Sequence, residues 1–156
     1  MPESTPVTIA IEDPDQPDVR AMIVASDAYM TALYPAESNH LVDVAALRSA
    51  NVRFLVGRRD GACVACGAIV IAADGAAEIK RMWVEPHARG SGLGRRILAA
   101  IEKLARGEGV EVLRLETGVS QVEAIHLYRS AGFSTIAAFG EYLPDPLSTF
   151  MEKRLD

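Results

Sequence analysis

A loop rich in arginine and glycine, placed between an expected strand and an expected helix, constrains this chain more than any other stretch. Residues 78–84 carry apolar types, Trp83 among them, that suit a half-buried strand, and Pro86 ends that strand. The sequence Arg-Gly-Ser-Gly-Leu-Gly follows over residues 89–94, and apolar residues then recur at helical spacing as far as Leu104. The stretch therefore predicts a strand, a tight loop and the first turn of a helix.

This loop predicts a binding site for an anion. Glycine at every second position lets the backbone approach a ligand, and the first N–H groups of the helix face that ligand with the positive end of the dipole. From residue 80 to 96 five residues are basic and Glu85 is acidic, although the whole chain has a net charge of −5. A glycine-rich connector with solvated arginines is the plain alternative, because short glycine motifs are weak signals.

Composition limits the class of protein. A chain of 156 residues, 49% of them hydrophobic and 24% charged, is long enough for one core, so we expect a single domain over residues 1–156. A pI near 5.2 argues against a general nucleic-acid binder. The sequence contains no apolar run of membrane-spanning length and no signal-peptide pattern at its start. We therefore expect a cytoplasmic protein with no nucleic-acid and no membrane partner.

The two cysteines, Cys63 and Cys66, have a spacing that occurs in metal and redox motifs. No second pair completes a zinc site. The alternation of an expected strand over residues 62–73 places the two side chains on opposite faces. We therefore expect no metal, and two cysteines that act as small buried hydrophobic residues.

The first third of the chain predicts a strand followed by two helices. The strand covers residues 7–12, and Asp15 or Asp18 is expected to cap the helix that follows and ends before Pro35. A short second helix is expected within residues 42–50, capped by Asp43.

The rest of the chain predicts a mixed sheet. Asp-Gly turns at residues 60–61 and 74–75 join three strands into an antiparallel meander, and the helix after the glycine loop makes the next strand parallel to the last of them. Further strands are expected over residues 51–59, 62–73, 110–117, 133–136 and 147–153, and further helices from 93 to about 106 and over 121–131. The order βααβββαβαββ indicates the α/β (α+β) class, with about seven strands and helices on both faces.

Two motifs together resemble the GCN5-related N-acetyltransferase (GNAT) superfamily. One is Arg89-x-x-Gly92-x-Gly94 between a strand and a helix, and the other is Leu-Tyr-Arg-Ser-Ala-Gly-Phe over residues 127–133. The order of elements is similar over nearly the whole chain. The resemblance implies the GNAT fold, acyltransferase activity (EC 2.3.1.-) and acetyl-CoA as cosubstrate, bound where the fourth and fifth strands splay apart.

The resemblance also implies which residues hold acetyl-CoA. In relatives the N–H groups of the loop bind the pyrophosphate, and peptide groups of the preceding strand bind the pantetheine arm like an added strand. Relatives often place asparagine at the start of the next helix; this chain departs from that pattern with Gln121, and Ser120 is expected to cap the helix. The expected cofactor-binding residues are Met82, Trp83, Val84, Arg89, Gly90, Ser91, Gly92, Leu93, Gly94, Arg95 and Gln121.

Two residues are candidates for proton transfer. Tyr128 matches the family tyrosine that faces the sulfur of CoA, and an unperturbed tyrosine pKa of about 10 makes proton transfer to an alkyl thiolate nearly thermoneutral. Glu78 is the candidate general base, because an alkylammonium with a pKa of about 10.4 must lose a proton before it attacks. Glu85 and His87 are weaker rivals. A core tyrosine and a solvated carboxylate are the plain alternatives.

Two further segments, residues 29–41 and 139–148, look like those of a bacterial GNAT subgroup with a poorly defined acceptor. In the family fold both border the acceptor site, so the expected contacts are Tyr34, Asn39, His40 and Tyr142; loop packing is the plain alternative. The net charge favours cationic acceptors. Small amines, amino acids, an antibiotic and a protein N-terminus or lysine all stay open, and a homodimer is common among relatives.

The sequence thus predicts acetyl transfer from acetyl-CoA to a primary amine by direct attack in a ternary complex. A backbone N–H near Val84 is expected to stabilise the oxyanion, and neither cysteine is placed to form an acyl intermediate. A Rossmann oxidoreductase fits poorly, because its third glycine would fall on Arg95. A noncatalytic acyl-CoA sensor on the same fold is the alternative from another class.

Overall fold

The structure is a computed structural model that describes residues 6–38 and 43–156. Its elements are β1 (Val7–Ile11), α1 (Pro17–Leu33), a 3₁₀ turn (Ala36–Ser38), α2 (Val44–Leu47), β2 (Val52–Arg59), β3 (Ala62–Ile71), β4 (Ala76–Val84), a second 3₁₀ turn (Pro86–Ala88), α3 (Leu93–Gly107), β5 (Val112–Gly118), α4 (Val122–Ser130), β6 (Ser134–Ile136) and β7 (Ser148–Arg154). The seven strands form one sheet in the order β1-β2-β3-β4-β5-β7-β6. The predicted order of elements and the mixed sheet are confirmed.

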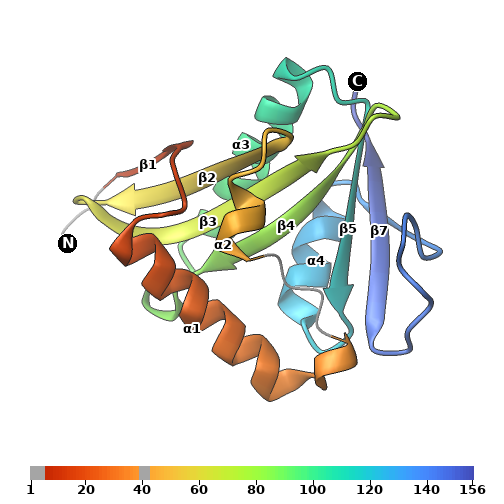
Figure 1. The fold of residues 1–156 in the computed structure, drawn as a ribbon, viewed down its shortest axis with the longest axis horizontal. Helices are drawn as coiled ribbons and strands as arrows, with labels where there is room; N and C mark the ends of the chain where they lie inside the picture. Colours follow the sequence, from red (N-terminus) through yellow and green to blue (C-terminus); the bar gives the residue numbers. More distant parts are fainter. Residues whose placement is uncertain (1–5, 39–42) are drawn as a thin grey trace.

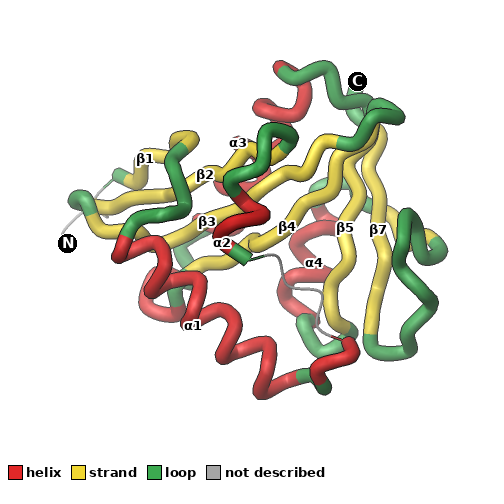
Figure 2. The backbone as a smooth tube through the Cα atoms, in the orientation of Figure 1, coloured by secondary structure: helices red, strands yellow, loops and turns green. Residues whose placement is uncertain are grey.

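Helices cover both faces of the sheet. Figures 1 and 2 show α1 and α2 in front of it and α3 and α4 behind it. Two separate cores follow from this arrangement: a rear core under α3 and α4, and a front core that includes Val19 and Met22 of α1, Leu47 of α2 and Trp83 of β4. Because side chains alternate along each strand, one strand supplies both cores.

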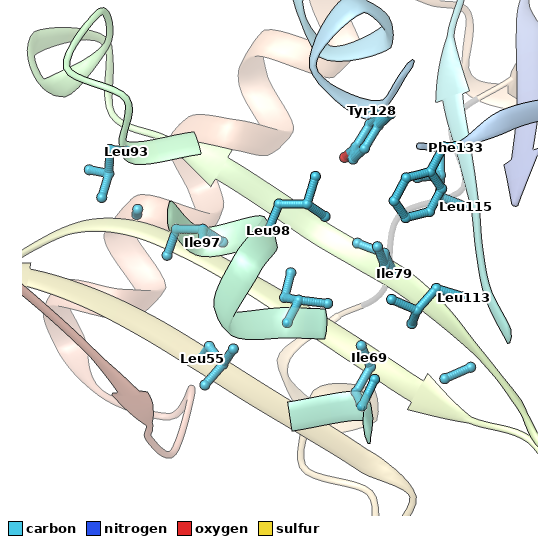
Figure 3. Close-up of a cluster of buried hydrophobic side chains, with 14 of the residues drawn as sticks. Leu55, Ile69, Ile79, Leu93, Ile97, Leu98, Leu113, Leu115, Tyr128 and Phe133 are labelled. Carbon is cyan, nitrogen blue, oxygen red and sulfur yellow. The ribbon is translucent and has the colours of Figure 1, made fainter. Parts of the chain in front are cut away.

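The rear core holds α3 tightly against the sheet. Leu93, Ile97 and Ile101 recur every fourth residue, so they form one stripe, and each is at most 2% exposed. Figure 3 shows Leu93 and Ile97 of this stripe together with core side chains of the sheet. A Cβ added at Gly67 on β3 would lie 2.8 Å from Cδ1 of Ile101, so the helix sits close to the strand there. Each fully buried side chain contributes about 1.5–3 kcal/mol.

Helix capping follows the prediction in one helix and not in another. The Asp43 carboxylate accepts a hydrogen bond from the N–H of Ala46 at 2.8 Å, as predicted for α2. The predicted cap of α1 is wrong: its N-cap is Gln16, which makes no side-chain cap. The Asp18 carboxylate instead pairs with Arg58 at 2.7 Å, an interaction that sequence spacing does not reveal.

The expectation of opposite faces for the two cysteines is wrong. Gly57 pairs with Ala65 and Arg58 pairs with Cys63, so Val64 is an extra residue that forms a β-bulge. The bulge resets the alternation, and Cys63 and Cys66 both pack on the front core. Within the described ranges no three candidate ligand side chains are grouped to hold a metal, and no helix is long and apolar enough to cross a membrane.

Candidate active site

Strands β4 and β5 part at the centre of the sheet. Their parallel pairing covers only Ala76–Ile79 of β4 and Val112–Leu115 of β5, although β4 runs on to Val84 and β5 to Gly118. Figure 1 shows the two arrowheads pointing apart. Arg81 lies in the diverging part of β4 with φ of 56°, a rare conformation for a residue other than glycine, next to a bulge opposite β3. The sheet therefore has a gap between β4 and β5 at its centre.

Val84 turns its peptide N–H and C=O toward this gap. The N–H of the next residue, Glu85, donates to the carbonyl of Val64 on β3 at 2.8 Å. In an antiparallel pair the neighbouring residue turns its N–H and C=O the other way, so those of Val84 face the gap and those of Trp83 face β3. Nε of Arg89 donates to the Val84 carbonyl at 2.9 Å. The N–H of Val84 is therefore the group placed to meet an oxygen in the gap.

The glycine loop lines a cavity of about 640 Å³, here called the glycine-loop cavity. Gly90 and Gly92 have φ of 82° and 79°, and a Cβ at either would meet no atom within 4 Å. This open space over the start of α3 suits a bulky anion. Of the predicted cofactor residues the cavity brings together Met82, Trp83, Val84, Arg89, Gly90, Gly92, Leu93, Gly94, Arg95 and Gln121. Ser91 does not line it, because its hydroxyl donates to the Ala88 carbonyl at 2.8 Å.

The Arg89 side chain stacks on aromatic rings. Its guanidinium carbon lies 4.7 Å from the ring centroid of Trp83 and 5.6 Å from that of Tyr29. Tyr29 belongs to α1, far away in the sequence, and also lines the glycine-loop cavity. Sequence reasoning did not single out a role for Tyr29, because only the fold brings α1 over the end of β4.

Tyr128 joins this cavity to a second one of about 110 Å³, here called the inner cavity. Both cavities are lined by Met82, Gln121, Ala124 and Tyr128. The Tyr128 hydroxyl contacts Sδ of Met82 at 3.4 Å, and its ring packs on Phe133 in the rear core (Figure 3). Burial raises the pKa of Tyr128 above its usual value, so in the free protein its phenol is a weaker acid than an unperturbed tyrosine.

Of the described residues, three with charged side chains line the inner cavity. Lys80 pairs with Glu78 at 3.0 Å, and Arg81, with its side chain 4% exposed, pairs with Asp27. Glu116 accepts a hydrogen bond from the Ser148 hydroxyl at 2.7 Å, and none of the ion pairs formed by the described residues includes it. Sequence reasoning missed Glu116. Its signal was the alternation on the strand, which turns Glu116 away from Leu115 and the rear core.

Tyr34 closes the inner cavity at the end of β5. Its hydroxyl accepts a hydrogen bond from the N–H of Ser120 at 3.2 Å, and burial raises its pKa. Its ring lies against Gly118, where a Cβ would be 1.8 Å from the hydroxyl oxygen. The predicted cap by Ser120 is wrong. Gln121 is the N-cap of α4, and its side-chain oxygen accepts the N–H of Gly118 at 3.0 Å.

Glu78 lines neither of these cavities. It lies with Tyr142 on a third cavity of about 1070 Å³, here called the outer cavity. Its carboxylate accepts a hydrogen bond from the Tyr142 hydroxyl and forms an ion pair with Lys80. Burial, followed by the hydrogen bond to Glu78, raises the pKa of Tyr142.

Two of the remaining predicted residues are not brought into any of the three cavities. Glu85 and His87 line none of the three cavities. Asn39 and His40, both predicted acceptor contacts, lie outside the described residues. Tyr34 and Tyr128 therefore line the same inner cavity, whereas Glu78 and Tyr142 line the neighbouring outer cavity.

Comparisons with known proteins agree with this geometry. The sequence model described as "Acetyltransferase (GNAT) family" matches residues 19–133. A protein of Azospirillum brasilense named IAA acetyltransferase is 53% identical over 150 residues, which cover 96% of this chain and 98% of that protein.

Two solved structures are similar in fold. The crystal structure of a Klebsiella pneumoniae protein described as an acyl-CoA N-acyltransferase has a TM-score of 0.82 and 40% identity, covering 96% of this chain and 98% of that one. YncA of Salmonella typhimurium, solved with its cofactor acetyl-CoA, has a TM-score of 0.71 and 24% identity, covering 96% of this chain and 94% of that one. At 24% identity that likeness concerns the fold.

Proposed function

The chain belongs to the acetyltransferase (GNAT) family, and we propose that it transfers the acetyl group of acetyl-CoA to a primary amine by direct attack in a ternary complex. Membership makes it an acyltransferase; the acceptor is the open part. The observation that carries the proposal is the junction at Tyr128 and Met82, where the glycine-loop cavity meets the small polar inner cavity. One cavity suits a long anionic cosubstrate and the other a small nucleophile.

The residues present fit acetyl-CoA. N–H groups from Gly90 to Arg95 would hold the pyrophosphate over the start of α3, where Gly90 and Gly92 leave open space. Met82 and Val84 would bind the pantetheine arm along the open edge of β4. Acetyl-CoA supplies the thioester whose acyl group is transferred. The N–H of Val84 donates to the carbonyl oxygen as negative charge develops there.

Two carboxylates compete for the role of general base. Glu116 lines the inner cavity together with Tyr128, whereas Glu78 lies in the outer cavity and is engaged by Lys80 and Tyr142. A base must reach the proton it removes directly or through one water, so Glu116 is placed better than Glu78. Its negative charge also attracts the ammonium form of the acceptor. Tyr128 then gives a proton to the departing sulfur, and its raised pKa keeps that proton on the phenol until the thiolate forms.

Direct attack is favoured over a covalent acyl-enzyme. The thiols of Cys63 and Cys66 contact the carbonyl oxygens of Asp18 and Arg81, and neither lines the inner cavity. Burial raises the pKa of both thiols, that of Cys66 to about 12, so neither supplies a thiolate at neutral pH.

An acceptor screen tests the proposal. The purified protein is incubated with acetyl-CoA and a panel of small amines, amino acids, a peptide and IAA, which the name of the Azospirillum relative suggests, and thiol release is followed. Turnover with any amine supports the proposal. Heat protection by saturating CoA without turnover for any acceptor would favour the noncatalytic sensor. A cytoplasmic location and a homodimer stay predictions, tested by cell fractionation and by light scattering.

A further inference from the structure

The outer cavity lies beside the inner cavity on the same face of the sheet. Glu78 and Lys80 alternate along β4 with Ile79, which points into the rear core, so both face forward. Lys80 lines the inner cavity and contacts Glu78 and Tyr142, which line the outer cavity. These contacts of Lys80 form one partition between the two cavities. A second partition is the contact between Ser38, which lines the inner cavity, and Asp145, which lines the outer cavity, with 2.7 Å between their side-chain oxygens. Both partitions are contacts between side chains, so opening them breaks no hydrogen bond between strands.

An aromatic cluster forms one wall of the outer cavity. Phe139 and Tyr142 pack edge to face at 5.2 Å between ring centroids, and each also packs on Phe150 of β7. Ile71 of β3 lines the cavity as well, and Leu143, 80% exposed, stands at its rim. A concave surface with aromatic and aliphatic lining and a few polar groups is the usual setting for an organic ligand.

The charge of the outer cavity is negative. The carboxylates that line it are Asp74, Glu78, Glu141 and Asp145, and the cation among its described lining residues is Arg114. Arg114 is paired with Glu152 at 3.3 Å and with Asp74 at 3.7 Å, and it stacks on Phe139 at 5.9 Å. A ligand carboxylate here would therefore lie among carboxylates of the protein.

Building on the proposed function, we propose that the outer cavity holds the body of the acceptor and selects an amine with an apolar, aromatic-sized body and no carboxylate. The amine end of such an acceptor passes the side-chain partition at Lys80 and Tyr142 and reaches Glu116 in the inner cavity. The ring lies on Phe139, and the acidic lining repels an amino acid of the same skeleton. The acceptor class is thus an arylalkylamine rather than an amino acid or a short alkylamine.

Three matched acceptors test this class. Steady-state kcat/KM is measured with 2-phenylethylamine, with phenylalanine, which adds a carboxylate to the same skeleton, and with ethylamine, which lacks the ring. We expect kcat/KM for 2-phenylethylamine to exceed that for each of the other two acceptors by about tenfold or more. Ethylamine lacks the favourable contact of the ring, and phenylalanine adds a charge that the cavity repels. Equal values for the three acceptors, or a preference for phenylalanine, would overturn the inference.

Variants connect the preference to the cavity. Phe139→Ala is expected to reduce the ratio of 2-phenylethylamine to ethylamine, and Glu141→Gln the ratio of 2-phenylethylamine to phenylalanine, with KM for acetyl-CoA unchanged. Val24→Ala is the matched control, since Val24 is 65% exposed and lines none of the three cavities. Unchanged ratios in both cavity variants would contradict the assignment.

Failure of the proposed function is distinguished from failure of this inference. Turnover of phenylalanine or ethylamine alone supports the acetyltransferase and refutes the arylalkylamine subsite. If no acceptor turns over, the inference is judged by heat protection of the CoA-bound protein by 2-phenylethylamine. Protection that Phe139→Ala removes and Val24→Ala retains supports the subsite, and any other pattern refutes it.

Discussion

Replacing Gly118 by alanine tests the placement of Tyr34, which forms the end of the inner cavity. The new Cβ would lie 1.8 Å from the hydroxyl oxygen and 2.0 Å from Cζ of Tyr34, so the ring must move. Displacing the ring by overpacking destabilises the folded state by about 1–3 kcal/mol. The lost hydrogen bond from the N–H of Ser120 adds about 1 kcal/mol. We therefore expect the free energy of unfolding to fall by about 2–4 kcal/mol, or Tm by roughly 4–16 °C for a domain of this size.

The assay combines thermal melting with kinetics. Gly107→Ala is the matched control, because a Cβ at this last residue of α3 meets nothing within 4 Å and alanine favours the helix. Since Tyr34 lines the inner cavity, kcat/KM for the acceptor should fall in Gly118→Ala and stay unchanged in Gly107→Ala.

A double-mutant cycle makes the reasoning refutable. Once Tyr34→Ala has removed the ring, Gly118→Ala should cost less than about 0.5 kcal/mol, because the clash is gone. If the Gly118→Ala protein has the same Tm as the wild type, Tyr34 does not lie against β5. The same cost in both backgrounds would show that the clash is with another group.

Three further predictions concern side chains that bind or release protons. Tyr128→Phe should lower kcat by about a hundredfold while heat protection by CoA is unchanged, and full kcat in this variant would remove the assigned acid. Glu116→Gln should lower kcat/KM about a hundredfold at neutral pH and Glu78→Gln by much less; the reverse order, measured on the same acceptor, would return the base to Glu78. The pKa of Cys66, raised to about 12 by burial, keeps its proton in the folded protein while the unfolded thiol loses it near about 8.5, so the free energy of unfolding should fall as pH rises from about 8.5 toward 12. When the free energy of unfolding is measured by chemical denaturation across this pH range, it should fall less steeply with pH for Cys66→Ala than for the wild type. An equal pH dependence in the two proteins would contradict the burial effect.

Much of the fold could be read from the sequence, because the deciding signals are local. The Asp-Gly turns, the cap at Asp43 and the stripe of Leu93, Ile97 and Ile101 each involve residues a few positions apart. The glycine loop is likewise set by its own residues, since Gly92 needs a positive φ to begin α3. The sequence therefore predicts these elements and the anion site without any tertiary contact.

The membership of each cavity depended on contacts between distant segments. Glu78 and Glu116 are both strand glutamates whose side chains face forward, and nothing in their local sequence separates them. The divergence of β4 and β5 after Ile79 places Glu116 beside Tyr128, and the loop that carries Tyr142 closes around Glu78. A strand predicts which face a side chain occupies, but only packing decides which cavity it enters.

Taken alone, the sequence determined the order of elements, the family and the loop that suits a pyrophosphate, since backbone geometry and helix dipoles act over a few residues. Tertiary structure decided the faces of Cys63 and Cys66 through a bulge, the raised pKa of Tyr128 through burial, and the stacking of Arg89 on Tyr29 and Trp83 through the placement of α1. Burial, strand register and charge pairing are properties of the folded whole, because each depends on residues that the chain brings together only when it packs.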